Sequence, residues 1–169
     1  MEGKPRGLLV PITTPFDPAT GEIAPVVLRD NARTMLDEGV AGIVAAGSTG
    51  EASLLAEDEF RQVVRWLRDI VPDDRWLVAG AGRESTRATV AACRAAAEEG
   101  ADAVLVRAPS YYGPVLTVDS LIDHFRHAQA DFPFVVDKAR PQHEENYQQE
   151  HDVEHGRQVQ RRFVVEVGF

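Results

Sequence analysis

The sequence predicts an α/β fold in which helices cover a parallel sheet. Two observations lead to this prediction. Short apolar segments alternate along the chain with segments whose apolar residues recur at helical spacing. The apolar segments also follow one another at intervals of roughly 30 residues, the length of a strand–helix–strand unit. Such alternation is typical either of an open doubly wound sheet or of part of a (β/α)₈ barrel.

The first half of the chain supplies two strand–helix units. A strand is expected at residues 7–12, and a helix after it should end at Gly39, a residue suited to a helix C-terminus. The second strand, residues 41–45, runs directly into Gly47-Ser48-Thr49-Gly50. The next helix has acidic residues at positions 57–59, where negative charge favours a helix start, and its apolar face extends to Val71.

The second half repeats the pattern. A third strand is expected at residues 75–79, and Ser85 or Thr86 can cap the alanine-rich helix that follows. The fourth strand covers residues 103–106, and Thr117 can cap a fourth helix. A fifth strand begins at residues 133–136. We therefore expect about four βα units plus the start of strand five, with the carboxyl ends of all strands at one edge.

The character of the chain changes at Asp137. From there to Arg162 it is rich in Gln, His and charged residues and has no periodic apolar face. We expect residues 1–136 to form the α/β part and residues 137–169 a divergent, poorly ordered or weakly helical tail. The abrupt change suggests the hypothesis that the tail comes from a shifted reading frame or an alternative exon.

Composition narrows the class of protein. The 169 residues carry a formal net charge of -9, which disfavours nucleic acid or an acidic membrane as a partner. The one cysteine, Cys93, cannot form an internal disulfide, and we expect it to be a small buried residue. The polar residues 1–6 do not resemble a signal sequence, and no apolar run reaches the length of a membrane span. We expect a soluble cytoplasmic protein.

The segment Gly47-Ser48-Thr49-Gly50 is the first candidate site. Its glycines permit a close approach of the backbone, and successive N–H groups in such a turn can bind an anion without a charged side chain. The two hydroxyl groups add further donors. The same residues can also form an ordinary βα turn with no ligand, and the turn alone leaves both interpretations open.

Four segments at the expected strand ends resemble a known family. They are Pro-Ile-Thr-Thr-Pro-Phe (11–16), Gly-Ser-Thr-Gly-Glu (47–51), Ala-Gly-Ala-Gly (79–82) and Pro-Ser-Tyr-Tyr (109–112). Together they resemble the dihydrodipicolinate synthase / N-acetylneuraminate lyase family, and residues 79–103 are similar to its 4-hydroxy-2-oxoglutarate aldolase branch. The resemblance implies a (β/α)₈ barrel, usually tetrameric, that acts as a class I aldolase. It implies that a lysine forms a Schiff base with pyruvate or a related 2-oxo acid, and that the resulting enamine attacks, or is released from, an aldehyde. Neither metal nor organic cofactor is implied.

By this resemblance, the backbone N–H groups of Ser48 and Thr49 bind the carboxylate of the 2-oxo acid. The Ser48 hydroxyl belongs to a proton relay, and Tyr112 completes the relay of a neighbouring subunit in a homo-oligomer. A hydroxyl relay moves protons without a charged group in the pocket. Without the resemblance, Tyr112 would be interpreted as an aromatic residue packed beside Tyr111.

The chain departs from the family after residue 136. The family continues strand five as Tyr-Asn-Val-Pro and carries the Schiff-base lysine on strand six, whereas this chain reads Asp-Lys-Ala-Arg-Pro at 137–141. Its two lysines are Lys4 and Lys138. Lys138, one strand early, is a substitute candidate whose polar surroundings do not favour a lowered pKa. An alternative is therefore a catalytically inactive fragment that binds a 2-oxo acid or associates with a full-length homologue.

Two further motifs suggest other chemistry. Residues 151–155 read His-Asp-Val-Glu-His, the spacing of two zinc ligands and a general base, but a third ligand well downstream is needed. Residues 80–85 approach a G-x-G-x-x-G nucleotide turn, although this turn follows the third strand rather than the first.

Charged residues at the strand ends complete the candidates. Glu51 and Glu84 could act as catalytic carboxylates, but we expect them to cap or orient their loops. Arg83 and Arg107 could meet an acidic substrate, although isolated charges of this kind generally face solvent.

Overall fold

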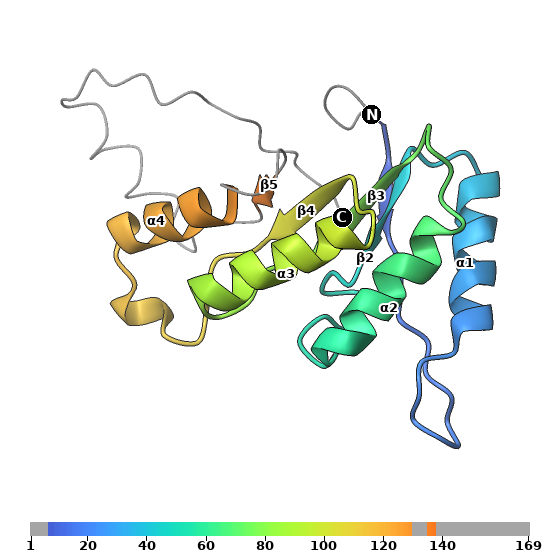
Figure 1. Cartoon of the computed structure of the whole chain (residues 1–169), viewed down its shortest axis with the longest axis horizontal. Coiled ribbons are helices and arrows are strands. Elements are labelled where there is room, and N and C mark those ends of the chain that lie inside the picture. The colour runs from blue at the N-terminus through green and yellow to red at the C-terminus, as the bar shows by residue number, and fades with distance from the viewer. Residues whose placement is uncertain (1–6, 130–134, 138–169) are drawn as a thin grey trace.

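The computed structural model describes residues 7–129 and 135–137 and shows one parallel sheet of five strands in the order β1-β2-β3-β4-β5 (Figure 1). The register pairs Leu9 with Gly42, Ile43 with Leu77, Val104 with Ala79 and Leu105 with Val136. The strands are β1 (Leu9–Pro11), β2 (Gly42–Ala45), β3 (Trp76–Gly80), β4 (Ala103–Val106) and β5 (Val135–Asp137).

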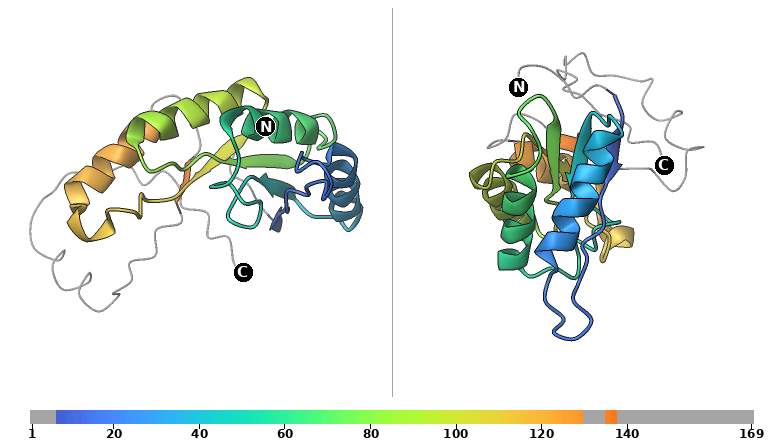
Figure 2. Two further views of the ribbon diagram at one scale, coloured as in Figure 1. Left: turned by 90° about the horizontal axis from the view of Figure 1, so that it is seen from below. Right: turned by 90° about the vertical axis from the view of Figure 1, so that its right-hand side faces the viewer.

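This strand order decides between the two architectures that the sequence left open. A doubly wound sheet reverses its strand order at a switch point, whereas a (β/α)₈ barrel adds each strand beside the preceding one. Each of the five strands lies next to its predecessor, and the helices lie along one side of the sheet (Figure 2). The structure is therefore part of a (β/α)₈ barrel, with four βα units and strand five.

The helices begin and end at residues that the sequence marks. Gly39 has φ +83° just after α1, and the Ser85 hydroxyl accepts a hydrogen bond from Ala88 N at the start of α3. The Thr117 hydroxyl accepts from Ser120 N at the start of α4. The end of α2 differs from the prediction: the helix ends at Arg68, whereas its apolar face was expected to extend to Val71. The bounds are α1 (Pro25–Asp37), α2 (Glu57–Arg68), α3 (Thr86–Glu98) and α4 (Val118–Gln129), with a short 3₁₀ helix, η1 (Gly113–Val115).

The two faces of the sheet belong to different apolar clusters. Alternate strand residues such as Ile43, Leu77 and Val104 pack with the helices, in a cluster that includes the buried Cys93 of α3. The residues between them face the other side, which in a complete barrel is the interior. They form a second cluster of Leu9, Val44, Trp76, Val78 and Ala103, with Ala41 and Leu105 beside it.

Ion pairs tie α2 to the end of α3. Arg61 and Arg65 of α2 both pair with Glu99, and Arg68 pairs with Asp102, whose carboxylate also accepts from Leu77 N at 2.8 Å. In the part of the chain that the structure describes, no helix is long and apolar enough to cross a membrane. The expectations for residues 138–169 lie outside the described residues.

Candidate functional site

The turn after β2 has an unusual backbone. We call residues 46–51 the β2 turn. Two residues other than glycine, Ala46 and Glu51, have positive φ angles of 47° and 58°. Side chains rarely adopt this conformation, and it generally persists only where surrounding contacts enforce it. The strain brackets the Gly47–Gly50 segment that the sequence singled out.

Backbone packing enforces this conformation. A Cβ at Gly80, the last residue of β3, would lie 2.0 Å from the carbonyl oxygen of Ala46, so only glycine allows the two segments to touch. A Cβ at Gly50 would meet Ile12 O at 3.0 Å. The β2 turn is therefore wedged between the ends of β1 and β3.

One buried hydroxyl also holds the turn. Thr14, which is 4% exposed, donates a hydrogen bond of 2.7 Å from Oγ1 to the carbonyl oxygen of Gly50. Thr14 belongs to the loop after β1, so its contact joins two strand ends across 36 residues of sequence. Sequence reasoning did not single out Thr14. The neighbouring Thr13 is exposed, and the two threonines look alike in the sequence.

Two N–H groups of the β2 turn, those of Ser48 and Thr49, have no partner among the described residues. Ser48 and Thr49 are exposed, and neither backbone N–H donates a hydrogen bond to any other residue that the structure describes. Adjacent N–H groups in a turn with positive φ angles can bind an anion. The predicted binding residues thus lie together on one rigid turn at the carboxyl end of β2.

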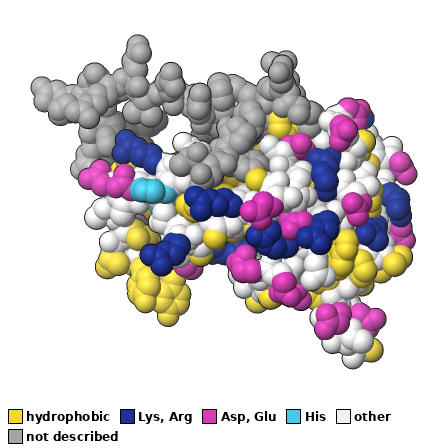
Figure 3. All heavy atoms as spheres, viewed as in Figure 1, with side chains coloured by type: hydrophobic (Ala, Val, Ile, Leu, Met, Phe, Trp, Pro, Cys, Tyr) yellow, Lys and Arg dark blue, Asp and Glu magenta, His cyan; other side chains and the backbone are white. Residues whose placement is uncertain are grey.

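The second candidate region is the loop after β4. We call residues 107–117 the tyrosine loop. Tyr111 and Tyr112 are exposed, and their rings pack edge to face with centroids 4.9 Å apart. No hydrogen bond joins Tyr112 to Ser48 or Thr49 within the described residues. Tyr111, Tyr112 and Val115 are all exposed. Figure 3 shows hydrophobic side chains gathered at the lower left of the molecule, where Figure 1 draws the loop between β4 and α4.

Glu84 connects the tyrosine loop to the end of β3. Its Oε2 accepts hydrogen bonds from Ser110 N at 2.9 Å and Tyr111 N at 3.0 Å, and its Oε1 lies 2.8 Å from Arg107 Nη2. The hydrogen bond from the Tyr111 backbone, with help from Arg107 and Ser110, lowers the pKa of Glu84 to about 2. Glu84 was expected to cap or orient its own loop, and the structure shows its carboxylate bound to the loop after β4 instead.

Arg83 differs from its expectation. Its side chain is only 15% exposed, its Nε lies 3.0 Å from Glu57 Oε1, and its guanidinium carbon lies 4.9 Å from the centroid of the Phe60 ring. The expectation of a solvent-facing charge is therefore wrong, because α2 supplies both a carboxylate and an aromatic face. Arg107 is about half exposed and pairs with Glu84.

Other candidates have structural roles or lie outside the description. Gly82 packs against the backbone of Arg107, because a Cβ there would lie 2.7 Å from Arg107 N, and Ser85 caps α3. Gly80 and Gly82 therefore allow close packing of neighbouring backbone segments. Lys4, Lys138 and residues 151–155 lie outside the described residues.

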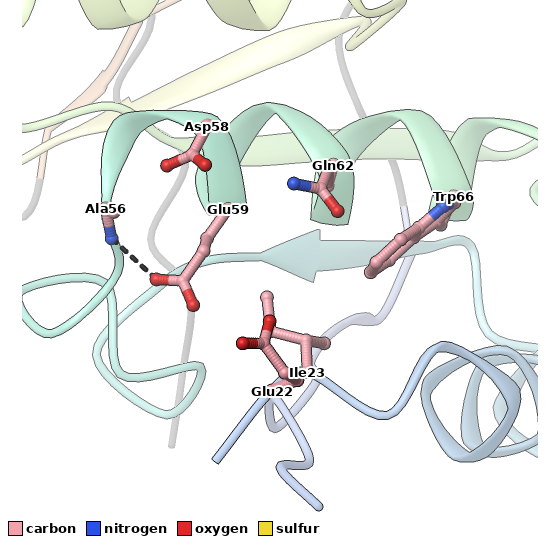
Figure 4. Close-up of a pocket in the computed structure, with 7 residues that line it drawn as sticks. All are labelled: Glu22, Ile23, Ala56, Asp58, Glu59, Gln62 and Trp66. Atoms are coloured by element: carbon pink, nitrogen blue, oxygen red, sulfur yellow. Dashed lines mark hydrogen bonds between the residues drawn. The ribbon is translucent and has the colours of Figure 1, made fainter. Parts of the chain in front are cut away.

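A cavity of about 340 Å³ lies elsewhere (Figure 4). It lies between α2 and the segment before α1, and none of the predicted site residues lines it. Its one internal hydrogen bond runs from Ala56 N to Glu59 Oε2 at 2.8 Å and caps α2. The residues that line it are Glu22, Ile23, Ala56, Asp58, Glu59, Gln62 and Trp66.

A buried histidine was also missed by sequence reasoning. His124 of α4 is 3% exposed, and its Nδ1 lies 3.0 Å from the Thr86 hydroxyl of α3. Its Nε2 is buried without a partner among the described residues, and burial lowers the pKa of the imidazole. Its position on the apolar face of α4, beside Leu121 and Ala128 in helical spacing, was the available signal.

Comparison with known proteins agrees with this geometry. Residues 4–138 match the model of the dihydrodipicolinate synthetase family. The chain belongs to this family. It is 38% identical over 121 residues to 4-hydroxy-tetrahydrodipicolinate synthase of Nitrobacter hamburgensis and 40% identical over 121 residues to that of Pseudomonas aeruginosa. Each match covers 72% of this chain and 40% of the relative.

Solved structures give the same result. Dihydrodipicolinate synthase of Acinetobacter baumannii, solved with pyruvate, is similar with a TM-score of 0.74 and 29% identity, over 79% of this chain and 45% of that one. The enzyme of Cyanidioschyzon merolae, solved with lysine bound, has a TM-score of 0.71 and 26% identity over 78% of this chain and 44% of that one. The chain thus spans less than half the length of these relatives.

Proposed function

We propose that this chain binds the carboxylate of pyruvate or a related 2-oxo acid at the β2 turn, as part of a carbon–carbon lyase of the class I aldolase type. The observation that carries the proposal is that the N–H groups of the exposed residues Ser48 and Thr49 donate to no other described residue, on a turn whose strained backbone is fixed by Gly80 and Thr14. Family membership and a relative solved with pyruvate support the same ligand class.

The β2 turn suits a carboxylate for an electrostatic reason. Two N–H dipoles stabilise a negative charge without a counter-charge that would compete for the reacting ketone. Because the turn is already strained into place, binding requires little reorganisation. The substrate carboxylate would then fix the ketone relative to the rest of the pocket.

The hydroxyl groups would provide proton transfer. We assign the Ser48 hydroxyl and the Tyr112 hydroxyl to a relay in which Tyr112 serves a neighbouring copy of the chain. The exposure of Tyr112 and the apolar side chains beside it support a homo-oligomer contact at the tyrosine loop. The aldehyde partner and the cytoplasm as compartment belong to the same proposal, and they rest on the family and on composition.

A second candidate is binding without catalysis. In this case the chain binds a 2-oxo acid, or associates with a full-length homologue, but forms no Schiff base. The observation that favours it is that neither Lys4 nor Lys138 matches the family's position on strand six. Where the second candidate binds a 2-oxo acid, the two candidates share the β2 turn and differ in the covalent step.

Borohydride trapping separates the two candidates. A lysine amine and the pyruvate ketone form an imine and water, and borohydride reduces the imine to a stable amine whose site is found by peptide mass spectrometry. An adduct at Lys138 supports a covalent reaction in this chain. Pyruvate binding without an adduct supports the non-catalytic candidate, and a Lys138→Arg variant controls for labelling at Lys4. If the chain binds neither pyruvate nor another 2-oxo acid, the catalytic candidate is wrong, and only association with a full-length homologue is left of the second candidate.

A further inference from the structure

We propose that Glu84 is a positioning residue that fixes the tyrosine loop and thereby the Tyr112 hydroxyl. This role rests on the proposed function only in that the Tyr112 hydroxyl is assigned to a proton relay there. The loop itself makes few contacts that could hold it, since Tyr111, Tyr112 and Val115 are all exposed. An exposed segment needs hydrogen bonds from elsewhere to keep one conformation.

The Glu84 carboxylate supplies these hydrogen bonds to the main chain. One oxygen accepts from two successive N–H groups, Ser110 at 2.9 Å and Tyr111 at 3.0 Å, directly before Tyr112. The other oxygen pairs with Arg107 at the start of the loop, and Arg107 Nη1 donates onward to Ser110 Oγ at 3.2 Å. Both ends of the segment before Tyr112 are therefore fixed by one side chain.

The ionisation of Glu84 supports positioning rather than proton transfer. The same hydrogen bonds lower its pKa to about 2, so the carboxylate is ionised across the physiological range. A general acid or base needs a pKa near the working pH. A permanently charged carboxylate instead accepts hydrogen bonds constantly, which suits a group that holds a loop.

A second contact from the same segment holds the far side of the loop. Thr86, two residues after Glu84, contacts Nδ1 of the buried His124, and α3 packs against α4. The tyrosine loop is thus fixed before Tyr112 by Glu84 and after it by α4. The first turn of α3 forms the platform from which Tyr112 is presented.

Amide hydrogen exchange on the full chain tests the positioning role. In Glu84→Ala, the Ser110 and Tyr111 N–H groups lose their acceptor, and we expect their exchange to accelerate by about tenfold or more. Arg107→Gln is the matched control. It breaks the ion pair but leaves both N–H groups their acceptor, so we expect less than about a threefold change. Equal acceleration in both variants, or none in Glu84→Ala, would overturn the proposal.

A spectroscopic readout reports Tyr112 directly. With 3-fluorotyrosine incorporated, and signals assigned by Tyr→Phe variants, the edge-to-face rings of Tyr111 and Tyr112 should give dispersed ¹⁹F shifts. We expect these shifts to collapse toward the free amino acid value in Glu84→Ala and to persist in Arg107→Gln. Unchanged shifts in Glu84→Ala would contradict a role in positioning Tyr112.

A measurement on the unaltered chain covers the case in which Glu84→Ala does not fold. The ¹³C signal of the Glu84 carboxyl should titrate far below the ordinary range of a glutamate, near pH 2. A midpoint above 4 would contradict the proposed hydrogen bonds. None of these readouts uses a 2-oxo acid. A chain in which they succeed but pyruvate does not bind would therefore refute the proposed function and not the role of Glu84 in the loop.

Discussion

The β2 turn and the tyrosine loop are both strand-end loops, but they are held by different forces. The β2 turn is fixed by backbone packing against Gly80 and by the hydroxyl of the buried Thr14. The tyrosine loop is exposed and is held by one carboxylate, Glu84, and by the contact of Thr86 with His124. The first should respond mainly to changes of volume, and the second to changes of charge and pH.

This difference fits the proposed tasks of the two regions. A turn that binds a carboxylate through its backbone must hold its N–H groups in place before the ligand arrives. A loop that presents a hydroxyl to another copy of the chain must remain exposed, so it cannot be held by burial. Charged hydrogen bonds give it order without burial.

Gly80→Ala should have the largest effect. The new Cβ would lie 2.0 Å from the Ala46 carbonyl oxygen, so β3 and the β2 turn must separate. We expect a loss of more than about 3 kcal/mol in the free energy of unfolding, measured by urea denaturation. Gly47→Ala is the control. Its Cβ would meet nothing closer than Val44 Cγ1 at 3.6 Å, and a change within about 0.5 kcal/mol is expected. Equal losses in both variants would contradict the packing account.

Thr14→Val should have the next largest effect. Valine keeps the shape of the side chain but leaves the Gly50 carbonyl without its donor, at a cost of about 1–2 kcal/mol in unfolding free energy. Thr13→Val, at the exposed neighbouring position, should stay within about 0.5 kcal/mol. Thermal unfolding of the two variants side by side gives the comparison, and a Thr14 variant as stable as the Thr13 variant would remove the hydroxyl from the account.

His124 should make the α4 side of the tyrosine loop sensitive to pH. Burial lowers its native pKa, the opposing attraction to Glu84 being smaller and His127 lowering it further. The unfolded chain, with a pKa near 6.5, therefore takes up the proton first. The contribution of neutral His124 to the free energy of unfolding should be fully present above about pH 6.5. It should fall as the pH drops toward the lowered native pKa. Unfolding free energies between pH 7.5 and 5 measure this slope.

The histidine variants provide the control for this slope. His124→Phe should flatten the dependence on pH, because the titrating group is gone. His127→Gln, which changes an exposed histidine on the same helix, should leave most of the dependence of the unfolding free energy on pH. A slope that survives in His124→Phe would assign the effect to other groups.

Tyr112→Phe and Ser48→Ala should have the smallest effect on stability. Both side chains are exposed, and neither hydroxyl makes a hydrogen bond to another described residue, so the free energy of unfolding should change by less than about 0.5 kcal/mol. Both variants keep the backbone N–H groups, so pyruvate binding should also persist. A loss above about 1 kcal/mol in the free energy of unfolding, measured by calorimetry, would show that these residues are structural.

The sequence was sufficient for the regular part of the fold. The alternation of strands and helices, the caps at Ser85 and Thr117 and the end of α1 near Gly39 all depend on local residue chemistry, and the structure confirms them. The sequence could not choose between a doubly wound sheet and a barrel. That choice depends on which strands lie side by side, and the strand order decided it.

The site was predictable to a lesser degree. The Gly47–Gly50 turn can be recognised from its glycine and hydroxyl residues, but the residues that hold it in place cannot be recognised from the sequence. Thr14 resembles Thr13, and Arg83 resembles a surface arginine until Glu57 and Phe60 are placed beside it by α2. Contacts between residues that are 26 or 36 positions apart depend on the packing of the whole sheet, which local patterns do not contain.

The most direct test of the account is an NMR titration of the ¹⁵N-labelled chain with pyruvate. The Ser48 and Thr49 amide signals should shift in a saturable manner, and lactate, which carries the same carboxylate, should shift the same two amides. The Ser110 and Tyr111 amides, held by Glu84, should remain unchanged. Saturable shifts confined to other residues, with Ser48 and Thr49 unmoved, would contradict the assignment of the β2 turn as the carboxylate site.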